Sequence, residues 1–499
     1  MELLSNLALG FEVAFSPVNL FYCFVGVFLG TFIGVLPGIG ALAAVSMLLP
    51  VTFYLEPATA LVMLAGVYYG AEYGGSIASI LLNLPGTPAA AVTCLDGYPL
   101  ARSGRAGVAL FMTTAASFVA AIIGILILTF FAPLLVKVAL AFGPAEYFAI
   151  MLLGLVAAAA ITMGSAIKGI GMVTVGILIG TVGTDINTGV WRFTFNSPYL
   201  IDGVSLVALA MGLFGITEVI ASINDSASAP KGSITLRSML PRRDDVRRSV
   251  LPILRGTGIG AFFGTLPGTG QTIAAFISYA VEKRVAADPS RFGKGAIEGI
   301  AAPEAANNAS AQTAFIPTLS LGIPGSATMA LMLGAMMIHG IAPGPMVIVN
   351  HPDIFWGVVA SFFIGNVLLV VLNVPLIGLW VRLLQVPYQY LYPVIIVLIC
   401  IGVYSVNNNV FDVALALLFG VVGYAMRLLG FEPAPLLIGF VLGPMMEENL
   451  RRGLLLARGD YYQLLAQPIT GSVLCLTLLL VLWSLWSSLR RRRAAAGAG

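Results

Sequence analysis

The chain has 499 residues, of which 59% are hydrophobic and only 9% are charged, and its mean hydropathy is +0.98. Soluble domains carry roughly 25% charged residues, so a soluble protein of this length could not bury so much apolar surface. The net charge of +3 is modest, and the basic residues gather in loops, which indicates membrane topology and no nucleic-acid binding. Continuous apolar runs without strand-like alternation therefore predict an all-α polytopic membrane protein.

The few reactive side chains exclude several classes of protein. The four cysteines lie far apart and the only histidines are His339 and His351, so no spacing typical of a zinc site, a di-iron site or a disulfide framework occurs. We expect no cofactor, with Na⁺ left open as a coupling ion. GTLPGTGQT (264–272) resembles a phosphate-binding loop, but it lacks the lysine and the spacing of that motif. An ATPase is therefore excluded, and a membrane enzyme would lack a clustered acid, base or metal group.

The first half of the chain, residues 1–223, contains a series of apolar runs that predict membrane helices. These runs cover residues 18–36, 41–54, 58–70, 75–95, 107–141, 145–163, 166–183 and 203–222. The run 107–141 exceeds the about 20 residues that one span needs, so it is either strongly tilted or divided near Pro133. Residues 224–249 are polar and basic, which predicts a cytoplasmic linker.

The second half, residues 250–468, continues with further apolar runs. They cover residues 250–266, 269–281, 354–384, 388–404, 410–428 and 432–446. A last segment, residues 469–499, holds one more span and four consecutive arginines. About 10–12 transmembrane helices are predicted. The arginines at 451–458 conflict with a cytoplasmic C-terminal tail, because one crossing would place these two basic groups on opposite sides of the membrane. We give the tail and the linker more weight in assigning the cytoplasmic side.

One motif occurs twice in the chain. GTFIGVLPGIG (30–40) and GAFFGTLPGTG (260–270) are offset by 230 positions, and seven of their eleven residues are identical. Each copy places a Pro-Gly-x-Gly break directly after an apolar run. Helices that are broken at matching points in two halves of a membrane protein are typical of a transporter binding site.

A second break follows in each half, at PGT (85–87) and at PGS (324–326). The first and second breaks are 48 residues apart in one half and 57 in the other, counted from proline to proline. We therefore predict two pseudo-symmetric repeats with broken or re-entrant helices. We favour an inverted arrangement, because paired breaks then meet near the middle of the membrane. A pair of kinked structural helices is the alternative.

The breaks supply groups that can bind ions. A Pro-Gly break frees backbone N–H and carbonyl groups, which must find partners in the membrane. Half-helix N-termini then present N–H groups to an anion, and unwound carbonyls suit Na⁺. The candidate substrate-binding residues are Gly38, Gly40, Ser46, Asn83, Gly86, Thr87, Gly268, Thr269, Gly270, Gln271, Thr272, Asn307, Asn308, Gly325, Ser326 and Thr328.

The stretch 298–313 is unusually polar for its surroundings. It contains Glu298, Glu304, Asn307 and Asn308. The asparagines could bind a carboxylate or a cation, and the two glutamates are candidates for cation coupling. A solvated loop at the membrane face is the alternative.

Glu72 is the third candidate for cation coupling. It lies in YYGAEYGGS (68–76), and an ionisable group at membrane depth is a functional candidate by default. Its aromatic neighbours also fit an interfacial position. The coupling ion stays open, because neutral Thr, Asn and Gln ligands suit Na⁺ whereas Glu72, Glu298 or Glu304 could carry a proton.

Several longer motifs together resemble the large membrane subunit of the tripartite tricarboxylate transporter family. The resemblance spans nearly the whole chain. It is carried by GVLPGIGA (34–41), YYGAEYGGSIASILLNLPGTP (68–88), DGYPLARSGRAG (96–107), GTVGTDINTGVWRFTF (180–195), GTLPGTGQT (264–272), PEAANNASA (303–311), LGIPGSATMALMLGA (321–335) and LGPMMEENLRR (442–452).

The resemblance implies a location, partners and a substrate class. The chain should work in a bacterial inner membrane with a small membrane subunit of about four helices, and a periplasmic solute-binding protein should deliver citrate-like tricarboxylates or related carboxylates. Uptake should be secondary and coupled to Na⁺ or H⁺. The layout also resembles elevator transporters, in which a transport domain moves against a scaffold. A stand-alone carboxylate transporter or channel without a periplasmic partner is the alternative.

Overall fold

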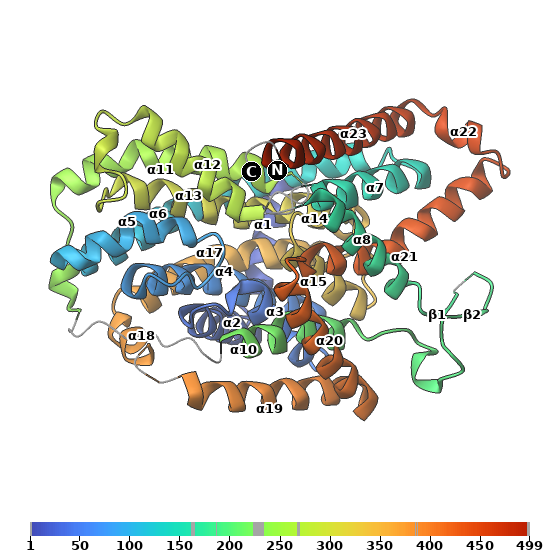
Figure 1. Cartoon of the computed structure of the whole chain (residues 1–499), viewed down its shortest axis with the longest axis horizontal. Coiled ribbons are helices and arrows are strands. Elements are labelled where there is room, and N and C mark those ends of the chain that lie inside the picture. Colours follow the sequence, from blue (N-terminus) through green and yellow to red (C-terminus); the bar gives the residue numbers. More distant parts are fainter. Residues whose placement is uncertain are drawn as a thin grey trace.

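The computed structural model of the chain describes residues 2–160, 165–185, 187–222, 234–266, 270–384, 386 and 388–496. Most of this part is helical (Figure 1). The only strands within these ranges are β1 (Gly183–Thr184) and β2 (Trp191–Arg192), which pair antiparallel with Gly183 opposite Arg192. The expected all-α architecture is therefore confirmed.

Four helices in the described ranges are long and apolar enough to cross a membrane. They are α2 (Pro17–Val35), α6 (Ala106–Ala139) together with α5 (Ala91–Leu100), α17 (Pro352–Asn373) and α20 (Val410–Leu428). Eight shorter apolar helices of 10–17 residues accompany them. The chain is thus a multi-pass membrane protein, and the total of about 10–12 spans stays a prediction.

The other helices connect and cover these four. They are α1 (Glu2–Ala14), α3 (Gly40–Thr52), α4 (Pro57–Leu82), α7 (Pro144–Ala160), α8 (Ala166–Gly180), α9 (Leu206–Ala210), α10 (Thr217–Ser222), α11 (Arg243–Gly264), α12 (Gly270–Val285), α13 (Glu298–Thr313), α14 (Phe315–Leu321), α15 (Ala327–Ile338), α16 (Met346–Asn350), α18 (Ile377–Leu383), α19 (Tyr388–Asn407), α21 (Pro433–Leu456), α22 (Tyr461–Leu465) and α23 (Pro468–Ala496), with π-helical turns η1 (Ala101–Arg105) and η3 (Met211–Ile216).

Some boundaries differ from those predicted. α4 runs unbroken through 68–76, because the tyrosines, the glycines and Glu72 of this stretch are buried against other helices instead of forming a turn. α6 is one helix of 34 residues with Pro133 inside it; at about 1.5 Å per residue it is longer than the about 30 Å hydrocarbon core, which fits the tilted alternative. α11 begins at Arg243, inside the segment 224–249.

Two helix pairs at the centre approach very closely because of glycine. In α2, glycines recur at every fourth residue, and a Cβ on Gly30 would lie 2.3 Å from the carbonyl oxygen of Val67 in α4. In α11 the same spacing faces α13, and a Cβ on Gly260 would lie 2.2 Å from the carbonyl oxygen of Ala306. Small residues that allow backbones to touch are typical of helix pairs in membranes, where lipid and side chains are equally apolar.

The helices form a core with two arms (Figure 1). The core comprises α2–α6 and α11–α17. The first arm contains α7, α8 and α21–α23, in which α21 packs on α7 and α8. The second arm contains α9, η3, α10, α19 and α20, in which α20 packs on η3 and α10. Both arms therefore combine helices from the two halves of the sequence.

Polar contacts gather at opposite ends of the molecule. At one end, Asp96 Oδ1 accepts hydrogen bonds from the backbone N–H groups of Gly293, Gly295 and Ala296 at 2.8–2.9 Å, and Arg105 pairs with Asp245 at 2.6 Å. The loop between α12 and α13 is thereby fixed to the end of α5.

At the other end lies the β1–β2 hairpin (Figure 1), which ion pairs attach to α21. Arg451 lies 2.8 Å from Asp185 and 2.6 Å from Glu447, and Arg192 lies 2.8 Å from Glu447. Arg451 therefore joins the hairpin to α21, and the conflict noted in the sequence stays open, because the positive-inside rule counts arginines whether or not they are paired.

Candidate substrate and cation site

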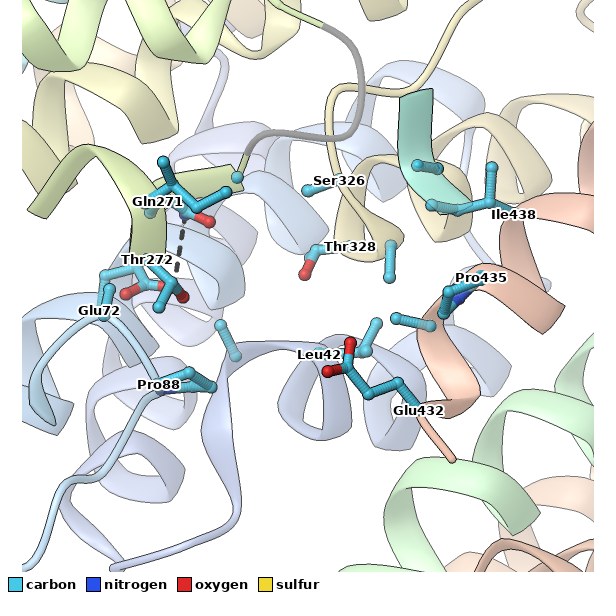
Figure 2. A pocket seen from close by; sticks show the side chains of 17 residues that line it. Leu42, Glu72, Pro88, Gln271, Thr272, Ser326, Thr328, Glu432, Pro435 and Ile438 are labelled. Carbon is cyan, nitrogen blue, oxygen red and sulfur yellow. Dashed lines mark hydrogen bonds between the residues drawn. The ribbon is translucent and has the colours of Figure 1, made fainter. Parts of the chain in front are cut away.

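A cavity of about 390 Å³ lies between the core and the first arm (Figure 2). The first turns of four helices, α3, α12, α15 and α21, form much of its wall. Its lining residues are Ala41, Leu42, Glu72, Pro88, Ala89, Ala158, Gly270, Gln271, Thr272, Ile273, Ser326, Ala327, Thr328, Glu432, Ala434, Pro435 and Ile438. The volume suits a small organic molecule.

The local sequence explains why these helices begin at the cavity. Gly40 and Gly270 have φ values of +73° and +62°, in the left-handed region where glycine is favoured. Ser326 caps α15, because its side chain accepts a hydrogen bond from the backbone N–H of Met329 at 3.3 Å. Pro433 opens α21, where a missing N–H costs nothing. The positive dipole end of each helix therefore lies at the cavity, and the starts of α3, α12 and α15 also supply backbone N–H groups, whereas α21 has prolines at 433 and 435 and supplies few.

Glu72 joins the two halves of the chain at this cavity. Its carboxylate accepts hydrogen bonds from Thr87 Oγ1 at 3.1 Å, from Asn307 Nδ2 at 3.2 Å and from Gln271 Nε2 at 3.4 Å. Gln271 also donates to the hydroxyl of Tyr68. Glu72 and its three hydrogen-bond donors were all candidates from the sequence, and they meet at one buried carboxylate. Figure 2 shows Gln271 pointing at this carboxylate.

Glu304 forms a second polar centre on α13. Both of its oxygens lie 2.8 Å from Ser76 Oγ of α4, and Thr93 Oγ1 of α5 donates to Oε1. Asn308, one turn later, donates to Ser117 Oγ of α6 at 2.7 Å. All these side chains are buried, which rules out the solvated-loop alternative for this part of 298–313.

Several buried oxygens on α13 and α6 have no hydrogen-bond partner among the described residues. The amide oxygens of Asn307, Asn308 and Gln312 and the hydroxyls of Thr113 and Ser310 belong to this group. Buried polar atoms are normally satisfied, so the unpaired amide oxygen of Asn307, whose Nδ2 donates to Glu72, is available to a proton donor or to a hard cation such as Na⁺.

The remaining candidates are scattered. Glu298 lies at the start of α13, away from both centres, and pairs with Arg291 at 3.0 Å. Ser46 is buried within α3 and donates to the carbonyl of Ala43 at 2.8 Å. Asn83 ends α4 in the left-handed conformation with φ 58°. None of these three lines the cavity.

The glycines of the breaks have two different positions. A Cβ on Gly86 would lie 2.3 Å from the carbonyl oxygen of Gly34, and one on Gly325 would lie 3.3 Å from that of Gly264, so both keep a break close to a core helix. Gly38 lines a second cavity beside the first. Gly268 and Thr269 lie outside the described residues.

The sequence interpretation missed one wall of the cavity. Glu432, Ala434, Pro435 and Ile438 at the start of α21 close it from the first arm. FEPAPLL, a proline-rich start directly before an apolar run, is a recognisable helix N-terminus, but it has no counterpart among the repeated breaks.

Charge distinguishes this cavity from a simple anion site. Among its lining side chains in the described part of the chain, Glu72 and Glu432 are acidic and none is basic. An anion bound here would therefore depend on N–H groups, amides and hydroxyls for its partners.

Comparison with known proteins agrees with this membrane architecture. The profile of the tripartite tricarboxylate transporter TctA family matches residues 20–438, which include every described residue that lines the cavity. The chain belongs to the TctA family. It is therefore a membrane component of a transporter that works with partner subunits.

Two relatives of this TctA protein come from Agrobacterium vitis. One, described as an uncharacterized 52.8 kDa protein in the TAR-I ttuC' 3' region, is 50% identical over 99% of this chain and 98% of its own length. The other, an uncharacterized protein in the TAR-II ttuC' 3' region, is 53% identical over 47% of this chain and 97% of its own length. No solved structure matches the chain.

Proposed function

We propose that this TctA protein is the large permease subunit of a secondary active uptake system for citrate-like tricarboxylates or related carboxylates. It acts in the bacterial inner membrane with a small four-helix subunit and a periplasmic solute-binding protein, and a Na⁺ or H⁺ gradient drives it. The observation that carries the proposal is the cavity walled by four helix N-termini, because such termini favour anions.

The polar groups of the cavity suit carboxylate oxygens. Thr272 and Thr328 offer hydroxyl donors, whereas the amide hydrogens of Gln271 are already directed at Tyr68 and Glu72. A substrate with several carboxylates could contact more than one helix start at once. Binding by neutral donors also leaves the substrate free to dissociate on the other side, which transport requires.

Glu72 provides the reason for cation coupling. Two like charges about 4 Å apart repel by about 4 kcal/mol at an effective dielectric constant of about 20. A carboxylate substrate beside ionised Glu72 is therefore disfavoured unless a proton or cation is present as well. Glu304 imposes the same requirement, since its partners among the described residues are neutral hydroxyls.

Equivalent contacts support two repeats. Gly30 and Gly260, 230 positions apart, contact Val67 and Ala306, 239 positions apart, and the second breaks share the latter offset. The arms also exchange helices between halves. An inverted, elevator-like arrangement, with the core moving against the arms, places the cavity at the sliding boundary.

Uptake of radiolabelled citrate in right-side-out membrane vesicles tests the function. We expect accumulation only when the small subunit, the cognate binding protein and a Na⁺ or proton gradient are all present. Accumulation without the binding protein would instead support the stand-alone transporter, and dissipation of an outward citrate gradient without any coupling ion would support a channel.

A further inference from the structure

A second cavity, of about 310 Å³, adjoins the first at the start of α3. The two share Ala41, Leu42, Pro88 and Glu432 in their walls. Its remaining wall comes largely from η3, α10 and α20 of the second arm. Because they have a common wall, a molecule leaving one cavity has the other directly beside it.

Arg427 is the only cationic side chain that lines either cavity within the described residues. It lies in the last turn of α20, and its Nη1 donates to Glu218 Oε2 of α10 at 2.9 Å. Its side chain is 55% exposed, compared with 19% for Glu218. The guanidinium is thus held at one corner by Glu218 while most of it faces open space.

The guanidinium group has binding capacity left over. It carries five N–H donors in a planar fork, and Nη1 makes the single hydrogen bond formed with described residues. The fork matches the two oxygens of a carboxylate, and such charge-assisted pairs are stronger than neutral hydrogen bonds. The first cavity, which is lined by glutamates and neutral groups, has no comparable feature.

We propose that Arg427 forms a second carboxylate-binding subsite. It lies in the second cavity, outside the cavity between the four helix starts, and binds the substrate there transiently. Glu218 holds the guanidinium in place and competes with the substrate for it. The inference rests on the proposed carboxylate transport. Since Arg427 and Glu218 both belong to the second arm, the subsite stays with the arm when the core moves.

The subsite lies close in sequence to the basic segment. Glu218 lies in the first turn of α10, which ends at Ser222, two residues before the segment 224–249 begins. On the proposed topology that segment is cytoplasmic, so we expect the subsite to receive carboxylate on release from the core.

Equilibrium binding of radiolabelled citrate to inside-out membrane vesicles tests the subsite. The full-length protein with its small subunit is compared with Arg427→Gln, Glu218→Gln and the control Arg452→Gln, which removes an exposed arginine from a matched pair with Glu448 outside both cavities. We expect Arg427→Gln to weaken citrate binding about tenfold. Glu218→Gln should tighten binding, because a competing carboxylate is lost, and Arg452→Gln should leave it unchanged.

The opposite expected effects of Arg427→Gln and Glu218→Gln on citrate binding distinguish a binding role of the ion pair from a purely structural role. An ion pair that only holds α10 to α20 predicts that both variants weaken binding or change nothing, and either result overturns the subsite. If Arg427→Gln does not reach the membrane, Glu218→Gln decides alone, since tighter binding supports the proposal and any other result refutes it. Absence of citrate binding by the wild type would refute carboxylate transport itself, and the subsite with it.

Discussion

Glu304 is a buried carboxylate whose partners among the described residues are neutral. Ser76 and Thr93 donate to it, and it forms no ion pair there. An isolated buried charge costs several kcal/mol, so in the folded protein this group is expected to be either protonated or occupied by a cation. That requirement is the reason why we propose Glu304 for cation coupling.

Replacing Glu304 with glutamine should uncouple transport. The amide keeps the size of the side chain and can still hydrogen-bond with Ser76, but it cannot take up a proton or balance a cation. We expect gradient-driven accumulation of citrate to fall at least about tenfold, measured in right-side-out vesicles with the binding protein present. Glu298→Gln is the matched control, because Glu298 is ion-paired with Arg291 away from the cavity. Equal accumulation by the two variants would exclude Glu304 from coupling.

At the level of single residues, the sequence predicted part of the site. Glu72, Thr87, Gln271 and Asn307 were all candidates, and the structure brings them together. The partners of Glu304 could not be predicted, because Ser76 and Thr93 are ordinary helix residues more than 200 positions away. Only the packing of α4 and α5 against α13 gives them a role.

The glycine faces of α2 and α11 determine how the core elements fit together. A side chain at Gly260 would overlap the backbone of α13, whereas Gly258, on the same helix, faces open space. Because both positions lie in the same helix, the same substitution changes helix propensity almost equally at each. A comparison of the two variants therefore isolates the effect of the backbone contact with α13.

Gly260→Val should force α11 away from α13 and destabilise the protein by about 1–3 kcal/mol or more. We expect a lower thermal midpoint of the detergent-extracted protein and less of it in the membrane. Gly258→Val should behave like the wild type in both measurements. If the two variants are equally stable, close approach of the helices is not what fixes the core.

The β1–β2 hairpin depends on Asp185. Hydrogen bonds from the backbone N–H groups of Asn187 and Thr188, together with Arg451, lower the pKa of this carboxyl below its ordinary value of 3.8. A lowered pKa in the folded state means that ionised Asp185 stabilises the hairpin above about pH 4, and that this contribution is lost as the pH falls through the lowered value.

Asp185→Asn should therefore loosen the hairpin at neutral pH. We expect faster chymotrypsin cleavage beside the exposed Phe193 and Phe195 than in the wild type. When cleavage is divided by that of an unfolded substrate at the same pH, to correct for the pH dependence of the protease, the wild type should resist equally at pH 7 and pH 5. Asp202→Asn, an exposed position in the same connection, serves as the control. A pH-dependent wild type between these values would contradict the pKa argument.

Element boundaries show where periodicity misleads. YYGAEYGGS reads as a gap between spans because it is polar and glycine-rich, yet it lies inside α4. The same glycines let α4 contact α2 and the second break, as the contacts of Gly70, Gly74 and Gly75 show. Composition alone cannot distinguish a glycine that breaks a helix from one that permits close packing.

Across the whole molecule, the arrangement of core and arms predicts a sliding boundary. α3 of the core contacts η3 of the second arm, and a Cβ on Gly215 would lie 3.9 Å from Cγ of Met47. Cysteines at these two positions are close enough for a disulfide.

Oxidation of a Met47→Cys/Gly215→Cys variant lacking its native cysteines should stop citrate uptake, and reduction should restore it. The control places cysteines at Ile80 and Gly97, two core positions that also touch, where a cross-link should leave uptake unaffected. Normal uptake by the oxidised first variant would refute movement of the core against the second arm. The amino-acid sequence could predict the repeated breaks behind this proposal, but not the exchange of helices between arms, which depends on distant contacts.

The loop that Asp96 fixes is longer than its counterpart in the first half, where only four residues join α3 to α4. A protein that arose by duplication would begin with two interchangeable faces. The extra residues between α12 and α13, bound through three backbone N–H groups, make one face unlike the other. The proposed repeats are therefore unequal at this loop, and a partner protein that contacts it could distinguish one end of the core from the other.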